Sequence, residues 1–283
     1  YAAALDAYSS VLRNDTSHSD SYLNRGIIYY QSQTYEKAIA ELNQAVQANP
    51  GHMYAYYYRG LSFYRQGAYV KAIADLDQTI FLEPSFSLAL YYRGNCYYMQ
   101  GQFEQAISDY TRTIDLDPND AYAYLSRANS YRKKNISGKA LEDYNRALDI
   151  DPGLVDARVH RGNIYLSLGQ YEAAVSDYTA ALTADPQDAY TYYNRSLALQ
   201  KLGRYEQAAA DYTAALELEP QIVGGLTGRA MAYLSAGKYP EALQDLNGAL
   251  LKEPNASWLY ELRGIVYLKQ DMLDQALLDL EKA

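Results

Sequence analysis

The chain has 283 residues, more than one compact hydrophobic core usually serves, and 49% of them are hydrophobic, as in globular proteins. Its net charge of -9 argues against nucleic acid and anionic membrane surfaces, because both require a basic footprint. No apolar run reaches the ~18 residues of a membrane span, so we expect no membrane insertion.

Prolines divide the chain into equal segments. Seven of the eight are spaced 34 residues apart, at Pro50, Pro84, Pro118, Pro152, Pro186, Pro220 and Pro254. A fixed period along a whole chain indicates one supersecondary unit repeated, in which each copy buries its open face on its neighbours. The 283 residues can therefore share one continuous, elongated core.

In chain order, residues 1–18 match the second helix of a partial repeat. Eight repeats follow, starting at residues 19, 53, 87, 121, 155, 189, 223 and 257, with the last one truncated. Each is predicted to form a helix, a glycine turn, a second helix and a proline turn, because glycine suits the left-handed end of a helix and proline blocks its continuation. We expect one continuous all-α domain of antiparallel helix pairs.

Small residues allow the two helices of each repeat to approach closely. The twentieth place is Ala in all eight repeats, and the eighth is always Gly, Ala or Ser. The eleventh place is aromatic in seven repeats, with Leu199 as the exception, and the fourth is Tyr in five. The fourth and eleventh places lie about two turns apart on one face of a helix.

These columns closely resemble the tetratricopeptide repeat (TPR) family, whose pattern runs aromatic, Leu-Gly, Tyr, Ala, aromatic, Ala and Pro over 34 residues. Repeat 6 shows it as DAYTYYNRSLALQKLGRYEQAAADYTAALELEP. The resemblance covers essentially the whole chain. It implies a right-handed α-solenoid, a superhelix whose first helices line a concave groove.

All eight repeats carry an arginine at the seventh place and an acid sixteen residues later, from Arg25 and Glu41 to Arg263 and Asp279. The arginine replaces the family's usual Leu. A half-buried guanidinium needs a partner because it cannot lose its charge. We expect structural Arg–carboxylate pairs that join helices, within a repeat or between neighbours. The alternative is a basic stripe for acidic ligands.

Tyrosine is the outlier of the composition, with 33 copies against 4 Phe and 1 Trp. Most tyrosines follow the repeat pattern, but some lie at other places of the first helices, mainly in repeats 1–3. These are Tyr30, Tyr54, Tyr57, Tyr58, Tyr64, Tyr91, Tyr92, Tyr98, Tyr122, Tyr190 and Tyr193. Tyrosine offers a large contact area and an adaptable hydroxyl, so we expect a peptide-binding groove. The alternative for any single ring is packing between first helices.

Asparagines add a second feature to the expected groove. They are Asn95, Asn129 and Asn163 at the ninth place, and Asn194 at the sixth place of repeat 6. An amide donates and accepts, which suits the backbone of an extended peptide. Some TPR superhelices, including that of the O-GlcNAc transferase family, use an asparagine ladder in this way. The alternative is hydrogen bonding to water or to neighbouring side chains.

Three other kinds of chemistry find no support in the sequence. A TPR carboxylate clamp would need basic residues where Val159, Gly224 and Gly228 stand. No Cys, His and acid cluster has metal-binding spacing, so we expect no cofactor, no metal and no catalysis.

The single cysteine, Cys96, leaves the compartment open, with a slight preference for the cytoplasm. The stretch GGLTGRA (224–230) predicts a locally weak first helix in repeat 7.

These features together predict a non-catalytic protein–protein interaction scaffold, which binds an extended peptide or a short helix in the concave groove. One alternative is the recognition arm of a larger enzyme, for example a glycosyltransferase, because neither end of the array has a polar capping helix. A second alternative is an assembly protein that self-associates end to end through the same faces.

Overall fold

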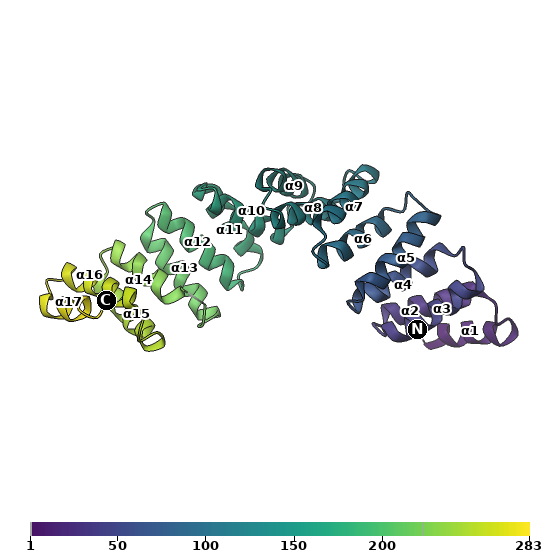
Figure 1. Cartoon of the computed structure of the whole chain (residues 1–283), viewed down its shortest axis with the longest axis horizontal. Helices are drawn as coiled ribbons and strands as arrows, with labels where there is room; N and C mark the ends of the chain where they lie inside the picture. Colours follow the sequence, from purple (N-terminus) through teal and green to yellow (C-terminus); the bar gives the residue numbers. More distant parts are fainter. Residues whose placement is uncertain (1, 223) are drawn as a thin grey trace. The chain divides into compact units, whose positions relative to one another are not determined.

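The computed structural model describes residues 2–222 and 224–283 as helices and short turns, without a strand among them (Figure 1). A single helix, α1 (Ala2–Asn14), precedes eight helix pairs. The first helices of the pairs are α2 (Ser19–Gln31), α4 (Met53–Arg65), α6 (Ser87–Met99), α8 (Ala121–Lys133), α10 (Val155–Ser167), α12 (Ala189–Lys201), α14 (Gly225–Ser235) and α16 (Ser257–Lys269). The second helices are α3 (Tyr35–Ala48), α5 (Tyr69–Leu82), α7 (Phe103–Leu116), α9 (Ser137–Ile150), α11 (Tyr171–Ala184), α13 (Tyr205–Leu218), α15 (Tyr239–Lys252) and α17 (Leu273–Leu280). The all-α solenoid class is confirmed.

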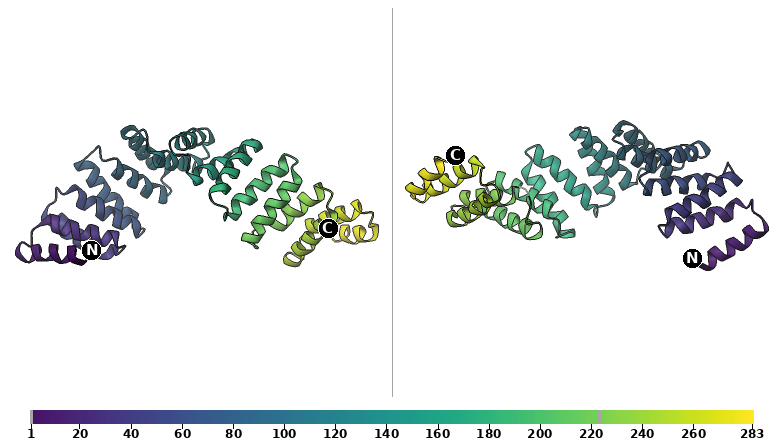
Figure 2. Two further views of the ribbon diagram at one scale, coloured as in Figure 1. Left: turned by 180° about the vertical axis from the view of Figure 1, so that it is seen from behind. Right: turned by 60° about the horizontal axis from the view of Figure 1, so that its bottom comes forward.

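The chain forms two compact units, Tyr1–Pro152 with α1 to α9 and Gly153–Ala283 with α10 to α17. Inside each unit, a second helix packs on its own first helix and on the first helix of the next repeat, as the two further views show (Figure 2). Neighbouring first helices touch as well. The single continuous domain stays a prediction. The expected start of repeat 7, residue 223, lies outside the described residues.

Left-handed residues separate the two helices of each pair. Five of these turns use glycines with φ of 73–74°, namely Gly67, Gly101, Gly169, Gly203 and Gly237. In the other three turns Gln33, Asn135 and Asp271 take a φ of 58°. Residues other than glycine rarely adopt this backbone conformation. The backbone geometry of the turn therefore explains why glycine recurs there.

The core consists of the small residues at the eighth and twentieth places of the repeats and of the side chains that pack against them. Every twentieth-place alanine is buried. A Cβ atom on Gly94 would lie 2.8 Å from a ring carbon of Tyr110, so the glycine is what allows α6 and α7 to enclose that ring. The largest fully buried side chains are Tyr110, Tyr144, Tyr178 and Tyr212, all from second helices.

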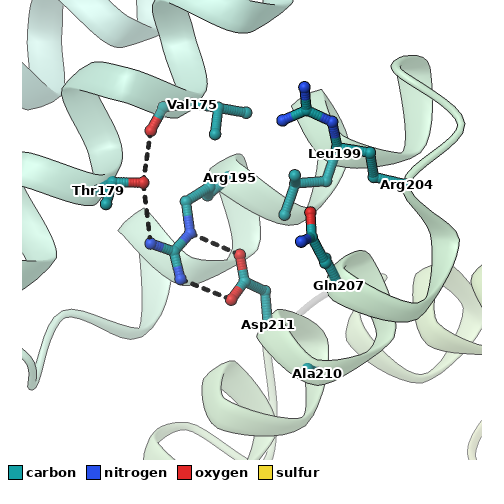
Figure 3. A pocket seen from close by; sticks show the side chains of 8 residues that line it. All are labelled: Val175, Thr179, Arg195, Leu199, Arg204, Gln207, Ala210 and Asp211. Carbon is teal, nitrogen blue, oxygen red and sulfur yellow. Dashed lines mark hydrogen bonds and ion pairs between the residues drawn. The ribbon is translucent and has the colours of Figure 1, made fainter.

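Each seventh-place arginine pairs with the acid sixteen residues later in its own repeat, which confirms the expected structural pairs. Figure 3 shows the arrangement in repeat 6, where Arg195 donates two hydrogen bonds of 2.7 Å to Asp211. Its Nη1 donates to Thr179 Oγ1, on the second helix of the preceding repeat, at 3.1 Å. One guanidinium therefore joins three helices. The basic stripe is wrong, because these cations are already neutralised.

Repeat 1 departs from this geometry. Glu41 is one methylene longer than aspartate and accepts only one hydrogen bond from Arg25, at 2.7 Å. Arg25 Nε and Glu41 Oε2 are buried without a hydrogen-bond partner within the described residues. The aspartate of the other seven repeats gives the two-point match that a guanidinium favours.

The first helix of repeat 7 is the shortest of its kind. α14 has 11 residues against 13 in α12, and it starts after Gly224, which has a φ of 78°. No side chain among the described residues caps its start, whereas Asp188 accepts hydrogen bonds from the backbone of Tyr190 and Thr191 at the start of α12.

We expect the amides of α14 to exchange with solvent at least about ten-fold faster than those of α12, because each helical glycine costs about 1 kcal/mol relative to alanine. Hydrogen–deuterium exchange read by mass spectrometry measures both helices in one experiment. Equal protection of α12 and α14 would contradict the weak helix.

Candidate functional site

The first helices α2, α4 and α6 bring the surplus tyrosines of repeats 1–3 together. Their rings touch mostly edge to face, with centroids 5.3–6.3 Å apart, and the contacts run on from one repeat to the next. The successive pairs are Tyr30–Tyr58, Tyr58–Tyr57, Tyr57–Tyr92, Tyr92–Tyr64 and Tyr92–Tyr91. Such pairs stabilise by about 0.5–1.5 kcal/mol beyond their burial. The rings therefore hold one another in place.

Tyr57 lies in the core, which corrects its predicted place in a binding groove. It is only 6% exposed and packs in one cluster with Leu61 and Leu90. Its ring centroid lies 4.9 Å from that of Phe86, just before the next first helix. The fifth place of α4 thus faces the following repeat, and a ligand cannot reach it.

Large side chains at the second place of the first helices are exposed. Tyr54, Tyr122 and Tyr190 are 48%, 57% and 64% exposed. In repeat 3 the same place holds Leu88, which is 46% exposed. Sequence reasoning missed Leu88 because it followed residue type, whereas the second-place column would have found it. We call Tyr54, Leu88 and Tyr122, on α4, α6 and α8, the second-place row.

The remaining predicted tyrosines are half-buried. They are Tyr30, Tyr58, Tyr64, Tyr91, Tyr92, Tyr98 and Tyr193. Tyr98 packs on Phe103 with centroids 5.5 Å apart, and Tyr193 packs on Tyr212 at 5.6 Å. These rings are therefore partly engaged in the helix packing and only partly accessible.

Arg65, at the end of α4, is a second residue that the sequence reasoning missed. It is exposed and lines a pocket of about 280 Å³ with Tyr30, Tyr35, Gln31 and Gln33. Hydrogen bonding to Tyr30 raises the pKa of Arg65 above its ordinary value. The pocket presents a cation, phenols and amides, all of which can donate hydrogen bonds.

Three of the predicted asparagines accept hydrogen bonds from the hydroxyls of buried tyrosines. Asn95, Asn129 and Asn163 each accept a hydrogen bond of 2.7 Å through Oδ1, and the donors are the hydroxyls of Tyr110, Tyr144 and Tyr178. Asn163 Oδ1 also accepts a bond of 3.1 Å from Nδ2 of Asn194. These contacts favour the neighbour-bonding alternative over a peptide ladder.

The sequence contains a signal for this pairing. The ninth place is Asn in repeats 3–5, where the twenty-fourth place is Tyr. Where the twenty-fourth place is Leu, the ninth place is apolar, as with Leu61 and Leu76 in repeat 2. In repeat 6, Tyr212 donates to Gln200 at the twelfth place instead, at 2.8 Å.

We expect Asn95→Leu to cost about 1–3 kcal/mol of stability, because it leaves the buried hydroxyl of Tyr110 without an acceptor. In a Tyr110→Phe background the same change should be nearly neutral. Urea unfolding of the two single variants and the double variant gives the coupling energy. A cost of Asn95→Leu that is equal in both backgrounds would contradict the pairing.

Burial also sets a pH limit on stability. It raises the pKa of Tyr144 and of Tyr212 to about 12, and it raises those of Tyr57, Tyr110 and Tyr178 as well. In the unfolded chain these phenols ionise near pH ~10. Their contribution is therefore complete below pH ~10 and is lost as the pH rises through ~12, because ionisation favours the unfolded chain.

We expect stability to fall above pH ~10 by about 1.4 kcal/mol per pH unit for each phenol that is ionised only in the unfolded chain. Urea midpoints at a series of alkaline pH values, with tyrosinate absorbance recorded in parallel, measure this slope. Gradual tyrosine ionisation at constant stability would show that these hydroxyls are accessible.

Among the described residues, no group of His, Cys, Asp and Glu side chains could hold a metal ion. Cys96 is buried, and its burial raises the pKa of the thiol to about 12, so the reactive thiolate is scarce at neutral pH. Within the same residues no helix is both long and apolar enough to span a membrane.

Stacked antiparallel helix pairs with a 34-residue period define an α-helical repeat protein of the solenoid class. The chain belongs to the tetratricopeptide repeat family. Models described as "Tetratricopeptide repeat" match residues 87–120, 121–154, 193–257 and 227–283, and a model described as "TPR repeat" matches 26–67 and 162–203. Together they cover most of the sequence. Repeats of this family typically form non-enzymatic interaction scaffolds.

Solved structures share the fold at low sequence identity. The C-terminal part of a TPR repeat-containing protein from Cytophaga hutchinsonii matches with a TM-score of 0.71 and 16% identity, over 85% of this chain and 98% of that one. A TPR protein from Parabacteroides merdae matches at 0.58 and 24%, over 81% and 91%. YrrB, described as a TPR protein with an unusual peptide-binding site, matches at 0.59 and 19%, over 66% and 97%. No curated protein matches the sequence.

Proposed function

We propose that the protein is a non-catalytic scaffold that binds an extended peptide or short helix of a partner on the first helices of repeats 2–4, within the concave groove of a TPR superhelix. The observation that carries this proposal is the second-place row. Tyr54, Leu88 and Tyr122 are about half exposed on three successive first helices. Exposed apolar side chains gathered in one region commonly mark an interaction surface.

The half-buried rings beside this row favour binding. Tyr58 and Tyr92 are held by ring contacts on both sides, so a ligand that packs on them immobilises few additional side chains. Tyrosine also loses little rotamer entropy, and its hydroxyl can serve a peptide backbone. A rigid ring base with exposed anchors fits a segment that is disordered before it binds.

Arg65 gives the surface a direction. It lies at the end of α4, whereas Tyr54 lies at its start. Arg65 is exposed and lines a pocket with Tyr30, so it places an accessible cation beside these rings in a chain with a net charge of -9. An acidic side chain or the terminal carboxylate of the bound segment would pair with Arg65, because a guanidinium matches carboxylates through two hydrogen bonds.

Peptides selected from a random display library test this proposal directly. We expect Tyr54→Ala with Tyr122→Ala to weaken selected peptides by at least about 30-fold in calorimetry, as hot-spot tyrosines do. Tyr190→Ala is the matched control, because it removes an exposed tyrosine from the same place in repeat 6. Wild-type affinity in the double variant would locate the binding surface elsewhere.

Self-association is a second candidate function with one observation in its favour. Leu273, Leu277 and Leu278 of α17 are all exposed, which leaves an apolar surface on the last helix. A second copy that packs on this surface would bury it. Light scattering across a concentration series, with Leu277→Lys as the disrupting variant, tests this function. A monomer at every concentration would exclude it.

A further inference from the structure

The eleventh-place rings share a feature beyond their aromatic character. Each of the seven lies beside a cation, with the charged group 5.5–6.0 Å from the ring centroid. The pairs are Lys37–Tyr29, Lys71–Phe63, Arg93–Tyr97, Lys139–Tyr131, Arg161–Tyr165, Arg229–Tyr233 and Arg263–Tyr267. A cation at this distance is attracted by the electron-rich face of a ring. The eleventh place therefore holds a ring that a neighbouring cation stabilises.

Repeat 8 shows the complete arrangement around one arginine. The guanidinium of Arg263 lies 5.5 Å from the ring of Tyr260 and 5.9 Å from that of Tyr267. In repeat 6, Arg195 keeps the first of these contacts, at 5.5 Å from Tyr192. The eleventh place there is Leu199, so the second ring is missing.

A pocket of about 420 Å³ opens at this position, between α11, α12 and α13 (Figure 3). Arg195 and Leu199 line it from α12. Arg204 lines it from the position just before α13, and Gln207 lines it from the first turn of α13. The small side chain of Ala210 completes the wall, where repeat 7 has the larger Gln244. Its volume falls within the range of about 300–1,000 Å³ that is typical of small-ligand sites.

The hydrogen bonds of Arg195 decide what chemistry the pocket favours. Its Nε and Nη2 donate to Asp211 and its Nη1 donates to Thr179, so all three guanidinium nitrogens are engaged. Asp211 already neutralises the guanidinium through the ion pair, so Arg195 offers little net charge to an anion. The face of the guanidinium needs no hydrogen bond to attract a ring, and an aromatic ligand can use it without disturbing the ion pair.

We propose that this pocket binds an electron-rich phenol ring, which takes the position of the missing eleventh-place ring against Arg195. The ring is either a free phenol or the side chain of a tyrosine in a partner. Arg204 and Gln207 are donors within the same pocket, and they suit the phenol oxygen. The site lies in repeats 5 and 6, and it does not depend on the peptide surface of repeats 2–4.

Titration with p-cresol, followed by NMR of the Val175 methyl groups and the Arg195 Nε–H, tests the site. We expect saturable shifts with p-cresol, and at least ten-fold weaker binding of 4-methylcyclohexanol, which has similar size and a hydroxyl but no aromatic face. N-acetyl-tyrosinamide distinguishes the two sources. If it binds as well as p-cresol, the pocket takes a peptide-borne tyrosine, and if only p-cresol binds, it takes free phenols.

Restoring the repeat pattern should close the pocket. We expect Leu199→Tyr to weaken p-cresol at least ten-fold and to raise the melting temperature, since the new ring packs on Arg195. Ala210→Gln closes the same space from α13 and serves if the first variant folds poorly. Leu168→Tyr is the matched control, because it adds the same ring at an exposed position outside the pocket. It should bind p-cresol as the wild type does.

Three results would overturn the proposal. The first is the absence of a saturable shift with p-cresol in the wild-type protein. The second is unchanged p-cresol affinity in folded Leu199→Tyr and Ala210→Gln variants. The third is equal affinity for 4-methylcyclohexanol, which would make the pocket a hydrophobic hollow without preference for a ring.

Discussion

Replacing Asp109 by Ala is expected to lower the free energy of unfolding by about 3–5 kcal/mol. Asp109 is buried and accepts two hydrogen bonds from Arg93, of 2.8 and 2.6 Å. These bonds raise the pKa of Arg93 above its ordinary value, and a guanidinium does not lose its charge in proteins. Without Asp109, two donors of a largely buried cation lose their acceptor.

Asp77 provides a control on the same arginine. It accepts a hydrogen bond of 2.7 Å from Nη1 of Arg93, but its side chain is 51% exposed. Water can replace it, so Asp77→Ala should cost no more than about 1 kcal/mol. The two variants remove the same functional group from one guanidinium and differ mainly in the burial of the carboxylate.

A third variant separates the unpaired charge from lost packing. The double variant with Arg93→Met and Asp109→Leu removes both charges and fills their space with apolar side chains. Most of the stability lost in Asp109→Ala should therefore return. Urea unfolding followed by circular dichroism measures all these variants, with a second probe because repeat arrays can unfold in more than one step. If Asp77→Ala and Asp109→Ala cost the same stability, burial of the carboxylate would not be the cause of the loss.

Local sterics explain why the helix pattern was predictable. Proline cannot continue a helix and glycine tolerates the left-handed turn, so both mark helix ends without information from distant residues. The arginine–acid pairs were predictable because both partners recur in all eight repeats. The additional bond to the preceding repeat was not, since its acceptor varies between Asn43, Asp77 and Thr111 in successive repeats.

The candidate site was less predictable, because burial depends on contacts between repeats. Tyr54 and Tyr57 lie three residues apart on one helix, yet only Tyr57 meets both Phe86, just before α6, and Tyr92 on α6 at close range. Asn95 has a polar side chain on a first helix. Only its contact with Tyr110 shows that it accepts the hydrogen bond of a buried hydroxyl. Residue type identified the region, and packing decided which members are accessible.

Tyr57→Ala is therefore expected to cost about 3–5 kcal/mol of stability, as loss of a buried aromatic side chain does. The change leaves a cavity at the point where the rings of Tyr58, Phe86 and Tyr92 meet, 4.9–6.3 Å from the original ring centroid. Tyr54→Ala removes a ring that is 48% exposed, so it should cost less than about 1 kcal/mol. Denaturant unfolding of both variants compares these costs.

The order should reverse when peptide affinity is measured. Tyr54→Ala should weaken a selected peptide, whereas Tyr57→Phe, which keeps the buried ring, should leave the affinity unchanged. This conservative variant is needed because Tyr57→Ala lowers affinity simply by unfolding part of the molecules. If Tyr57→Phe weakened the peptide as much as Tyr54→Ala, the hydroxyl of Tyr57 would have to reach the ligand, and the surface would have to open for binding. If it does not, the ring network supports the second-place row from below, and stability and recognition reside in different tyrosines of the same helix.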